Sequence, residues 1–346
     1  AWARLVVEIG ALDVAGRITA RESNHLQTSL AAASLNAALL VARRELARRH
    51  GRLACGPRLS VLGLGRLGSA GVDFGSDLDV VLVYDQKVPS PVAGLTREEA
   101  YARMSELLVT ALSSLTRDGH LYRVDLRLRP DGRNGAPAVG AEGFTNYLRE
   151  RAGVWEWLAY VKLRAVAGDL ELGRAVEREA RAVLHEAARR AGAEVLSAET
   201  RRVRARLEQE RGASRARGVR GARDIKFGPG GMLDVYFAAR YLQLRDGVTD
   251  EGEDRSTRAT LARLRAAGSL DEADFRALDE GYTLLRALDH TLRLLAGRST
   301  RLPAAEDHPT LRDLARAHDY PSPDALTAHL DAHAAAVRSA YERITS

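Results

Sequence analysis

The stretch that decides the fold runs from Arg58 to Asp85 and reads RLSVLGLGRLGSAGVDFGSDLDVVLVYD. Two short runs rich in Val and Leu flank a segment of Gly, Ser and Asp, which predicts two strands joined by a tight connection. The glycines from Gly63 to Gly68 match the G-x-G-x-x-G pattern of dinucleotide-binding folds. Only eight residues separate Gly68 from Asp77, whereas a parallel crossover needs at least about 10–12 residues. We therefore expect the two strands to be antiparallel neighbours, which argues against a dinucleotide-binding fold.

Three aspartates in this region are the candidate catalytic and metal-binding residues. Asp77 and Asp79 open the second strand two residues apart, so both point to one face. Further on, alternation in LYRVDLRLRPDG puts Asp125 on a polar strand face together with Arg127 and Arg129. An Asp-x-Asp pair alone is more often a turn and a strand edge. A second strand that carries a carboxylate and guanidiniums on one face favours a metal–phosphate site.

These residue types predict chemistry on ATP, with Mg²⁺ as the metal. Carboxylate oxygens are hard ligands that suit Mg²⁺, which binds through a few carboxylates and substrate phosphates. Two metal ions spanned by Asp77, Asp79 and Asp125 would hold a nucleophile and a leaving pyrophosphate in line. A turn at Gly68 and Ser69 would let backbone N–H groups approach the triphosphate. This combination is the pattern of the polymerase-β nucleotidyltransferase superfamily.

Hydrophobic periodicity divides the chain into three parts. Residues 1–52 are predicted to form a helical lead-in, 53–140 the nucleotidyltransferase core and 141–346 a helical bundle domain. Within the core, a helix over about 97–115 is expected to begin after Thr96. The predicted fold class is α+β, with a small mixed or antiparallel sheet followed by a C-terminal helical bundle.

The composition limits the compartment and the partners. The 346 residues include 52 Lys+Arg and 46 Asp+Glu, a net charge of +6 that permits an anionic ligand without requiring one. Cys55 is the single cysteine, which excludes an intrachain disulfide and indicates a reducing, cytoplasmic compartment. No apolar stretch is long enough to span a membrane. The chain begins without Met or a signal pattern, which predicts a piece of a longer protein.

Three other features have two interpretations each. Nine arginines lie between Arg201 and Arg223, but without interleaved aromatics we interpret them as a solvated helix face, so nucleic acid is not an expected partner. Lys226 precedes the turn FGPGG, which is either an anion site at a helix start or a plain helix boundary. His329 and His333 are four apart, a candidate metal pair, but lacking a third ligand nearby they are interpreted as surface histidines.

The deciding residues resemble one family, the glutamate–ammonia ligase (glutamine synthetase) adenylyltransferases, which include adenylyl-removing enzymes. The matching stretches are GLGRLGSAGVDFGSDLDVVLVYD, YRVDLRLRPDGRNGAPAVGAEGFTNYLRERAGVWEWLAYVKLRAVAGD and DIKFGPGGMLDVYFAARYLQL. The resemblance implies metal-binding roles for Asp77, Asp79 and Asp125. Family proteins carry two such units in tandem, one attaching AMP to a glutamine synthetase tyrosine and one removing it by phosphorolysis. This chain resembles half of such a protein or a stand-alone relative.

Three departures from the family pattern stand out. Arg66 occupies the place of a Lys and keeps the charge, and Gly68-Ser69 and Gly71-Val72 stand where the family has Gly-Gly and Glu-Leu. Tyr236 replaces the Glu of D-I-E-F, which leaves open which of the two reactions survives. The residues expected to bind the nucleotide are Gly68, Ser69, Arg66, Arg127, Arg129 and Lys226. We further expect Lys226 to face Asp77 and Asp79.

The resemblance implies Mg²⁺-dependent transfer of AMP to, or its phosphorolytic removal from, a glutamine synthetase tyrosine. ATP or phosphate is then the small substrate, and the PII signal protein is a candidate regulator. One alternative is another polymerase-β-type nucleotidyltransferase that acts on RNA or a small molecule. The other is a non-catalytic module that binds nucleotide and a partner. RNA activity calls for a basic aromatic groove, and a silent module for a lost carboxylate; the sequence has neither feature.

Overall fold

The computed structural model describes residues 1–117, 119–213, 223–252, 254–297, 300–303 and 308–346. Contacts divide the chain into two units, Ala1–Ala187 and Ala188–Ser346, which are described one after the other. The division into three parts at residues 52 and 140 stays a proposal. Within the described ranges, no helix combines the length and the apolar character needed to cross a bilayer.

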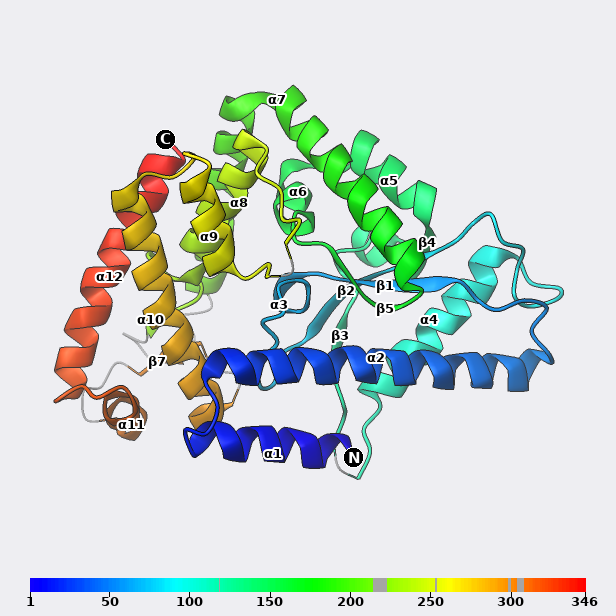
Figure 1. The fold of residues 1–346 in the computed structure, drawn as a ribbon, viewed down its shortest axis with the longest axis horizontal. Helices are drawn as coiled ribbons and strands as arrows, with labels where there is room; N and C mark the ends of the chain where they lie inside the picture. The colour runs from blue at the N-terminus through cyan, green and yellow to red at the C-terminus, as the bar shows by residue number, and fades with distance from the viewer. Residues whose placement is uncertain (118, 214–222, 253, 298–299, 304–307) are drawn as a thin grey trace. The chain divides into compact units, whose positions relative to one another are not determined.

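The first unit is built on a mixed sheet (Figure 1). Its strands are β1 (Leu59–Gly63), β2 (Leu78–Tyr84), β3 (Val124–Asp125), β4 (Ala138–Gly140) and β5 (Arg164–Gly168). Strand β1 pairs antiparallel with β2, which confirms the prediction from the short connection, and antiparallel with β5 on its other edge. Strand β2 pairs parallel with both β3 and β4. Strand β5 corrects the expectation that the chain is wholly helical after residue 140.

Helices cover the sheet, and two of them begin at capping boxes. The helices of this unit are α1 (Trp2–Val14), α2 (Ala20–His50), α3 (Gly65–Gly68), α4 (Arg97–Ser113), α5 (Ala141–Glu150) and α6 (Val154–Tyr160), with the 3-10 turn η1 (Gly132–Asn134). The Thr96 hydroxyl accepts from the Glu99 backbone, and the Glu99 carboxylate accepts from the Thr96 backbone. This reciprocal pair satisfies two donors at the start of α4 and confirms the predicted helix. Thr19 and Glu22 do the same for α2.

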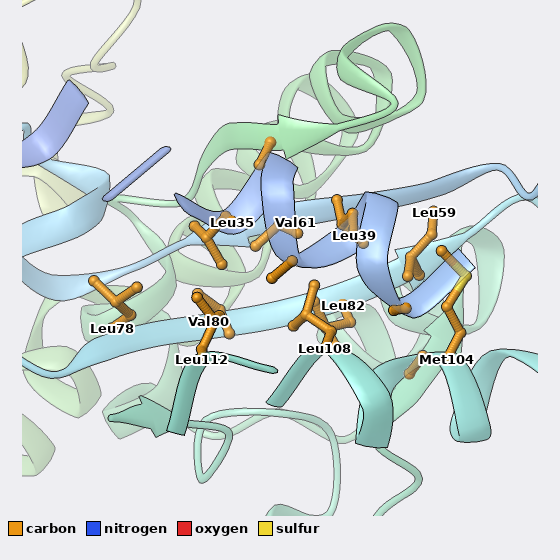
Figure 2. Packing of buried hydrophobic residues seen from close by; sticks show 14 of the residues in the cluster. Leu35, Leu39, Leu59, Val61, Leu78, Val80, Leu82, Met104, Leu108 and Leu112 are labelled. Atoms are coloured by element: carbon orange, nitrogen blue, oxygen red, sulfur yellow. The ribbon is translucent and has the colours of Figure 1, made fainter. Parts of the chain in front are cut away.

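The core of this unit lies between one face of the sheet and helices α2 and α4 (Figure 2). Alternate residues of β2, Leu78, Val80 and Leu82, point into it and are fully buried. Leu35 of α2 and Leu108 of α4 pack against them. Because side chains alternate along a strand, this packing turns Asp79 to the opposite face of β2. The core therefore determines on which side of the sheet the carboxylates lie.

Helix α7 (Leu170–Ala213) continues from the first unit into the second and bends at Gly192, where φ is +80°. The second unit then contains α8 (Met232–Asp246), α9 (Thr257–Ala266), α10 (Glu272–Ala296), α11 (Pro309–Ala317) and α12 (Pro323–Ile344), with the short strands β6 (Arg223–Asp224) and β7 (Arg301–Leu302). Helix α10 packs lengthwise on α12 (Figure 1), and α12 also packs on α8. These helices confirm the predicted helical C-terminal region.

Candidate active site

The three predicted carboxylates come from one edge of β2 and its parallel neighbour β3. Leu78 lies beside Val124 and Asp79 beside Asp125, and the Leu78 backbone N–H donates to the Arg123 carbonyl at 2.9 Å. Neighbouring strands lie about 4.8 Å apart, so the Asp79 and Asp125 side chains leave the sheet side by side. Asp77 precedes Asp79 by two residues, and all three aspartates are half-buried. The register therefore brings Asp79 and Asp125 together, and Asp77 lies immediately before the strand.

Arg127 is the cation that holds Asp125. Its side chain donates to Asp125 Oδ2 from Nε at 2.8 Å and from Nη2 at 2.5 Å, and its backbone N–H donates to Oδ1 at 2.8 Å. Burial raises the pKa of Asp125, but these hydrogen bonds and the guanidinium charge outweigh burial and lower that pKa overall. Hydrogen bonding to Asp125 raises the pKa of Arg127, and the charges of Asp79 and Asp77 add to the effect. Arg127 thus pairs with Asp125 and is stabilised in its charged form by Asp77 and Asp79 as well.

We expect Arg127→Met to raise the pKa of Asp125, because the variant keeps the burial and loses the charged donor. The same substitution at Arg123, whose side chain is exposed, should leave the pKa of Asp125 unchanged. The measurement is the pH titration of carboxyl ¹³C shifts in Asp-labelled protein. An Asp125 titration that is identical in wild type and Arg127→Met would show that Arg127 does not pair with Asp125 in solution.

The strand that carries Asp125 is much shorter than its alternating sequence predicts. Strand β3 ends at Asp125, and the chain then turns over residues 126–135. Inside that turn the Arg129 guanidinium donates to the carbonyls of Leu126, Arg133 and Gly135 at 3.0, 3.0 and 2.9 Å. The expectation that Arg127 and Arg129 share a strand face with Asp125 is therefore wrong. Backbone carbonyl oxygens need hydrogen-bond donors. Arg129 donates to three of these carbonyls and so closes the turn.

Tyr160 and Arg151, which lie between β4 and β5, brace the same turn, a role that the sequence did not suggest. The Tyr160 hydroxyl donates to the Leu128 carbonyl, and Arg151 pairs with Asp131, where φ is +60°. Tyr147 donates to the buried carboxylate of Glu156 at 2.5 Å. The stretch WEWLAY thus contributes, through Tyr160, a hydroxyl that positions the loop following Asp125.

Arg129→Met should lower the free energy of unfolding by about 2–3 kcal/mol, because two partly buried carbonyls and one exposed carbonyl lose a charged donor. Arg123→Met is the matched control, with an expected change within about 0.5 kcal/mol at an exposed position. Urea unfolding followed by circular dichroism measures both. Equal midpoints for the two variants would rule out a bracing role for Arg129.

The glycine that approaches the carboxylates is Gly65 rather than Gly68. Gly65 has φ +52°, and a Cβ placed on it would collide with Oδ2 of Asp79. At Gly68 a Cβ would lie 2.5 Å from the Lys162 carbonyl oxygen, so that glycine serves the packing of α3 on the backbone. Its N–H donates to Leu64 at 2.9 Å, which contradicts the expectation that this N–H is available to a triphosphate. Sequence spacing alone does not distinguish the two glycines.

Ser69, next to this turn, has its hydroxyl directed at the backbone. It lies 3.0 Å from the Gly65 carbonyl oxygen and 3.3 Å from that of Arg66. Such bonds to carbonyls three and four residues earlier hold the end of a short helix. The contacts describe a structural role for Ser69, while its predicted role in phosphate binding stays a prediction.

Comparison with known proteins provides independent evidence on the family of this chain. A family model described as Glutamate-ammonia ligase adenylyltransferase matches residues 3–179. The chain belongs to this family. A second model, described as GlnD PII-uridylyltransferase, matches residues 198–345 in the helical unit. The boundary between the structural units at Ala187 falls between the two matched ranges.

Curated relatives named bifunctional glutamine synthetase adenylyltransferase/adenylyl-removing enzyme align along nearly the whole chain. The protein of Mesorhizobium japonicum is 34% identical over 340 residues, which is 96% of this chain and 33% of that protein. The proteins of Xanthobacter autotrophicus and Streptomyces coelicolor are 33% and 32% identical, over 98% and 99% of this chain and 34% of each relative. The chain thus spans about a third of the length of these relatives.

Arg66 and Lys226 are the remaining residues expected to bind nucleotide in this adenylyltransferase family member. Arg66 pairs with the buried carboxylate of Asp73 at 3.3 Å, within the first unit. Lys226 lies in the second unit, with its ammonium 5.1 Å from the centre of the Phe227 ring. Asp224 accepts from the Lys226 backbone N–H at 3.0 Å and so fixes the start of the turn. The placement of Lys226 opposite Asp77 and Asp79 stays a prediction.

Tyr236, which replaces the family Glu, packs between α8 and α10 in the second unit. Its ring meets Tyr282 edge-on at 5.7 Å between centroids, and the two hydroxyls lie 3.4 Å apart. One turn further along α8, burial lowers the pKa of Arg240 to about 10, opposed by the charge of Asp250 and by both tyrosines. Tyr236 thus packs on Tyr282 and acts electrostatically on the buried Arg240.

Proposed function

We propose that this chain is a nucleotidyltransferase unit that transfers AMP from ATP to a tyrosine of glutamine synthetase, or removes it by phosphorolysis. The observation that carries the proposal is the β2–β3 register, which sets Asp79 beside Asp125, with Asp77 immediately before β2. Membership of the adenylyltransferase family supports the reaction class. Names of relatives that are about three times as long support glutamine synthetase as the acceptor.

The donor set fits Mg²⁺, because it consists of half-buried carboxylate oxygens beside a glycine backbone. Asp77, Asp79 and Asp125 would hold the metal, which supplies charge neutralisation at the phosphate oxygens when bound. Among the residues that the structure describes, no three His, Cys, Asp or Glu side chains are already arranged to hold a metal ion. Asp125 is instead engaged by Arg127. Binding of metal and nucleotide therefore requires that pair to open.

Arg127 is well suited to such an exchange. Its side chain is 68% exposed, so it can swing without disturbing the core. A guanidinium presents a planar fork that matches a carboxylate and a phosphate equally well. In our proposal Arg127 leaves Asp125 and donates to the phosphates, while the braced turn keeps its backbone in place. Lysine at this position would keep the charge and lose the fork.

The test is incubation of the chain with glutamine synthetase, Mg²⁺ and α-labelled ATP. We expect label on glutamine synthetase if the unit attaches AMP. If it removes AMP, adenylylated glutamine synthetase and phosphate should yield ADP. Label transferred to RNA instead would favour the alternative nucleotidyltransferase, and nucleotide binding with none of these products would favour a silent module. Repeating the assay with PII signal protein present tests whether that protein changes the rate of AMP transfer or removal. Both proteins are expected in the cytoplasm.

A further inference from the structure

Two histidines on one face of α12 direct their ring nitrogens at each other, far along the chain from the carboxylates. His329 and His333 are separated by one helical turn, and their Nε2 atoms lie 2.9 Å apart. The ring centroids are 4.5 Å apart. His329 is exposed and His333 half-buried, so the gap between the nitrogens is open to solvent. Residues four apart on a helix are neighbours, which gives the pair a fixed backbone.

The spacing of the two nitrogens matches a particular coordination geometry. Imidazole nitrogen binds divalent transition metals at about 2.0–2.1 Å. With that bond length, two nitrogens 2.9 Å apart subtend an angle of about 90° at a shared ion. Adjacent positions of a square-planar or tetragonal site have this angle, and such sites are typical of Cu²⁺ and Ni²⁺. A tetrahedral Zn²⁺ site would call for about 3.3 Å between the nitrogens.

A tyrosine hydroxyl contacts the other ring nitrogen of the first imidazole, Nδ1 of His329. The hydroxyl of Tyr320 bonds to Nδ1 of His329, and the two rings are 5.6 Å apart. When the hydroxyl accepts the Nδ1 proton, the Nε2 lone pair of His329 points into the gap. Metal-binding histidines almost always have such a partner on the second nitrogen, which fixes the tautomer and the ring orientation.

The second imidazole lies beside the first and is half-buried. A metal ion takes the place of a ring proton, so both rings would bind it as neutral imidazoles. The charge of Glu280 on α10 acts on His333. Water would complete the coordination, because the described residues offer no third His, Cys, Asp or Glu ligand at this place.

We propose that His329 and His333 form a binding site for a divalent transition metal ion, Ni²⁺ or Cu²⁺, through their two Nε2 atoms in adjacent positions. Tyr320 is a positioning residue for His329. The site is separate from the proposed Mg²⁺ site in its ligands, since imidazole selects transition metals and carboxylate selects Mg²⁺. The competing interpretation is a hydrogen bond between the rings alone.

Calorimetric titration of Ni²⁺ into the tag-free full chain, with excess Mg²⁺ present, tests the proposal. We expect one Ni²⁺ per chain. His329→Ala and His333→Ala should each weaken binding by at least about tenfold, since loss of an outer partner alone costs about 10–100-fold. Tyr320→Phe should weaken it about tenfold. His25→Ala, which removes a single exposed histidine from α2, should change nothing.

Metal-free thermal unfolding checks that the variants fold, and histidine ring NMR shifts on Ni²⁺ addition locate the ion. Equal Ni²⁺ affinity in the wild type and the double His329→Ala/His333→Ala variant would overturn the proposal. So would the absence of Ni²⁺ binding by the wild type, which would leave only the hydrogen bond between the rings.

Discussion

Asp77→Asn and Asp79→Asn are each expected to remove nearly all AMP transfer, a loss of at least about a hundredfold, because metal-held charge supplies most of the catalysis of phosphoryl transfer. The fold should survive, since an amide replaces a half-buried carboxylate of the same shape. The measurement is the initial rate of label transfer from α-labelled ATP over a range of Mg²⁺ concentrations, with circular dichroism as the folding check.

Asp85 offers a matched control at the other end of the same strand. It follows Tyr84, which pairs with Leu59, and its carboxylate faces Arg58 at 3.3 Å. Asp85→Asn should keep the wild-type rate and Mg²⁺ dependence. If Asp77→Asn or Asp79→Asn also keeps a near-normal rate with unchanged Mg²⁺ dependence, the metal assignment is wrong.

Asp234→Ala should destabilise the helical unit by about 3 kcal/mol, because the buried Arg204 loses its closest carboxylate and keeps only Glu208 at 3.2 Å. Asp234 is fully buried, and Arg204, 1% exposed, pairs with it. The Asp234 carboxylate also accepts from the Gly230 backbone N–H at 2.7 Å, so it links α7 to the turn before α8. Both the ion pair and the turn lose their acceptor in the variant.

Hydrogen exchange of the α8 amides isolates this effect from the rest of the chain. We expect much faster exchange in α8 of Asp234→Ala and unchanged exchange in β2. Asp331→Ala breaks a pair with Arg223 in which the aspartate is 63% exposed, and it should cost at most about 1 kcal/mol. Similar exchange rates in the two variants would contradict a central role for Asp234.

Sequence patterning predicted what depends on local spacing. The eight-residue connection was enough to predict antiparallel β1 and β2, and Thr96 with Glu99 was enough to predict the start of α4. Asp79 and Asp125 were placed on polar strand faces, and the register brings them together. These features follow from hydrophobic periodicity and helix capping, which are properties of short segments of sequence.

What the sequence did not predict depends on contacts between distant segments. Alternation predicted a long strand around Asp125, but carbonyl bonds from Arg129 and Tyr160 close a turn there instead. Strand β5 was expected to be helical, because a short run of small and apolar residues after Arg164 fits either structure. The close approach of Gly65 to Asp79 depends on how α3 lies on β2, which the glycine motif does not encode.

The most direct test of the central claim is a crystal structure of the chain with Mn²⁺ and a non-hydrolysable ATP analogue. Mn²⁺ takes the oxygen ligands that Mg²⁺ prefers and is visible by its anomalous scattering. Our account predicts an anomalous peak shared by Asp77, Asp79 and Asp125, with Arg127 moved from Asp125 to the phosphates. A bound nucleotide with Mn²⁺ held by other residues, and Arg127 still paired with Asp125, would contradict it.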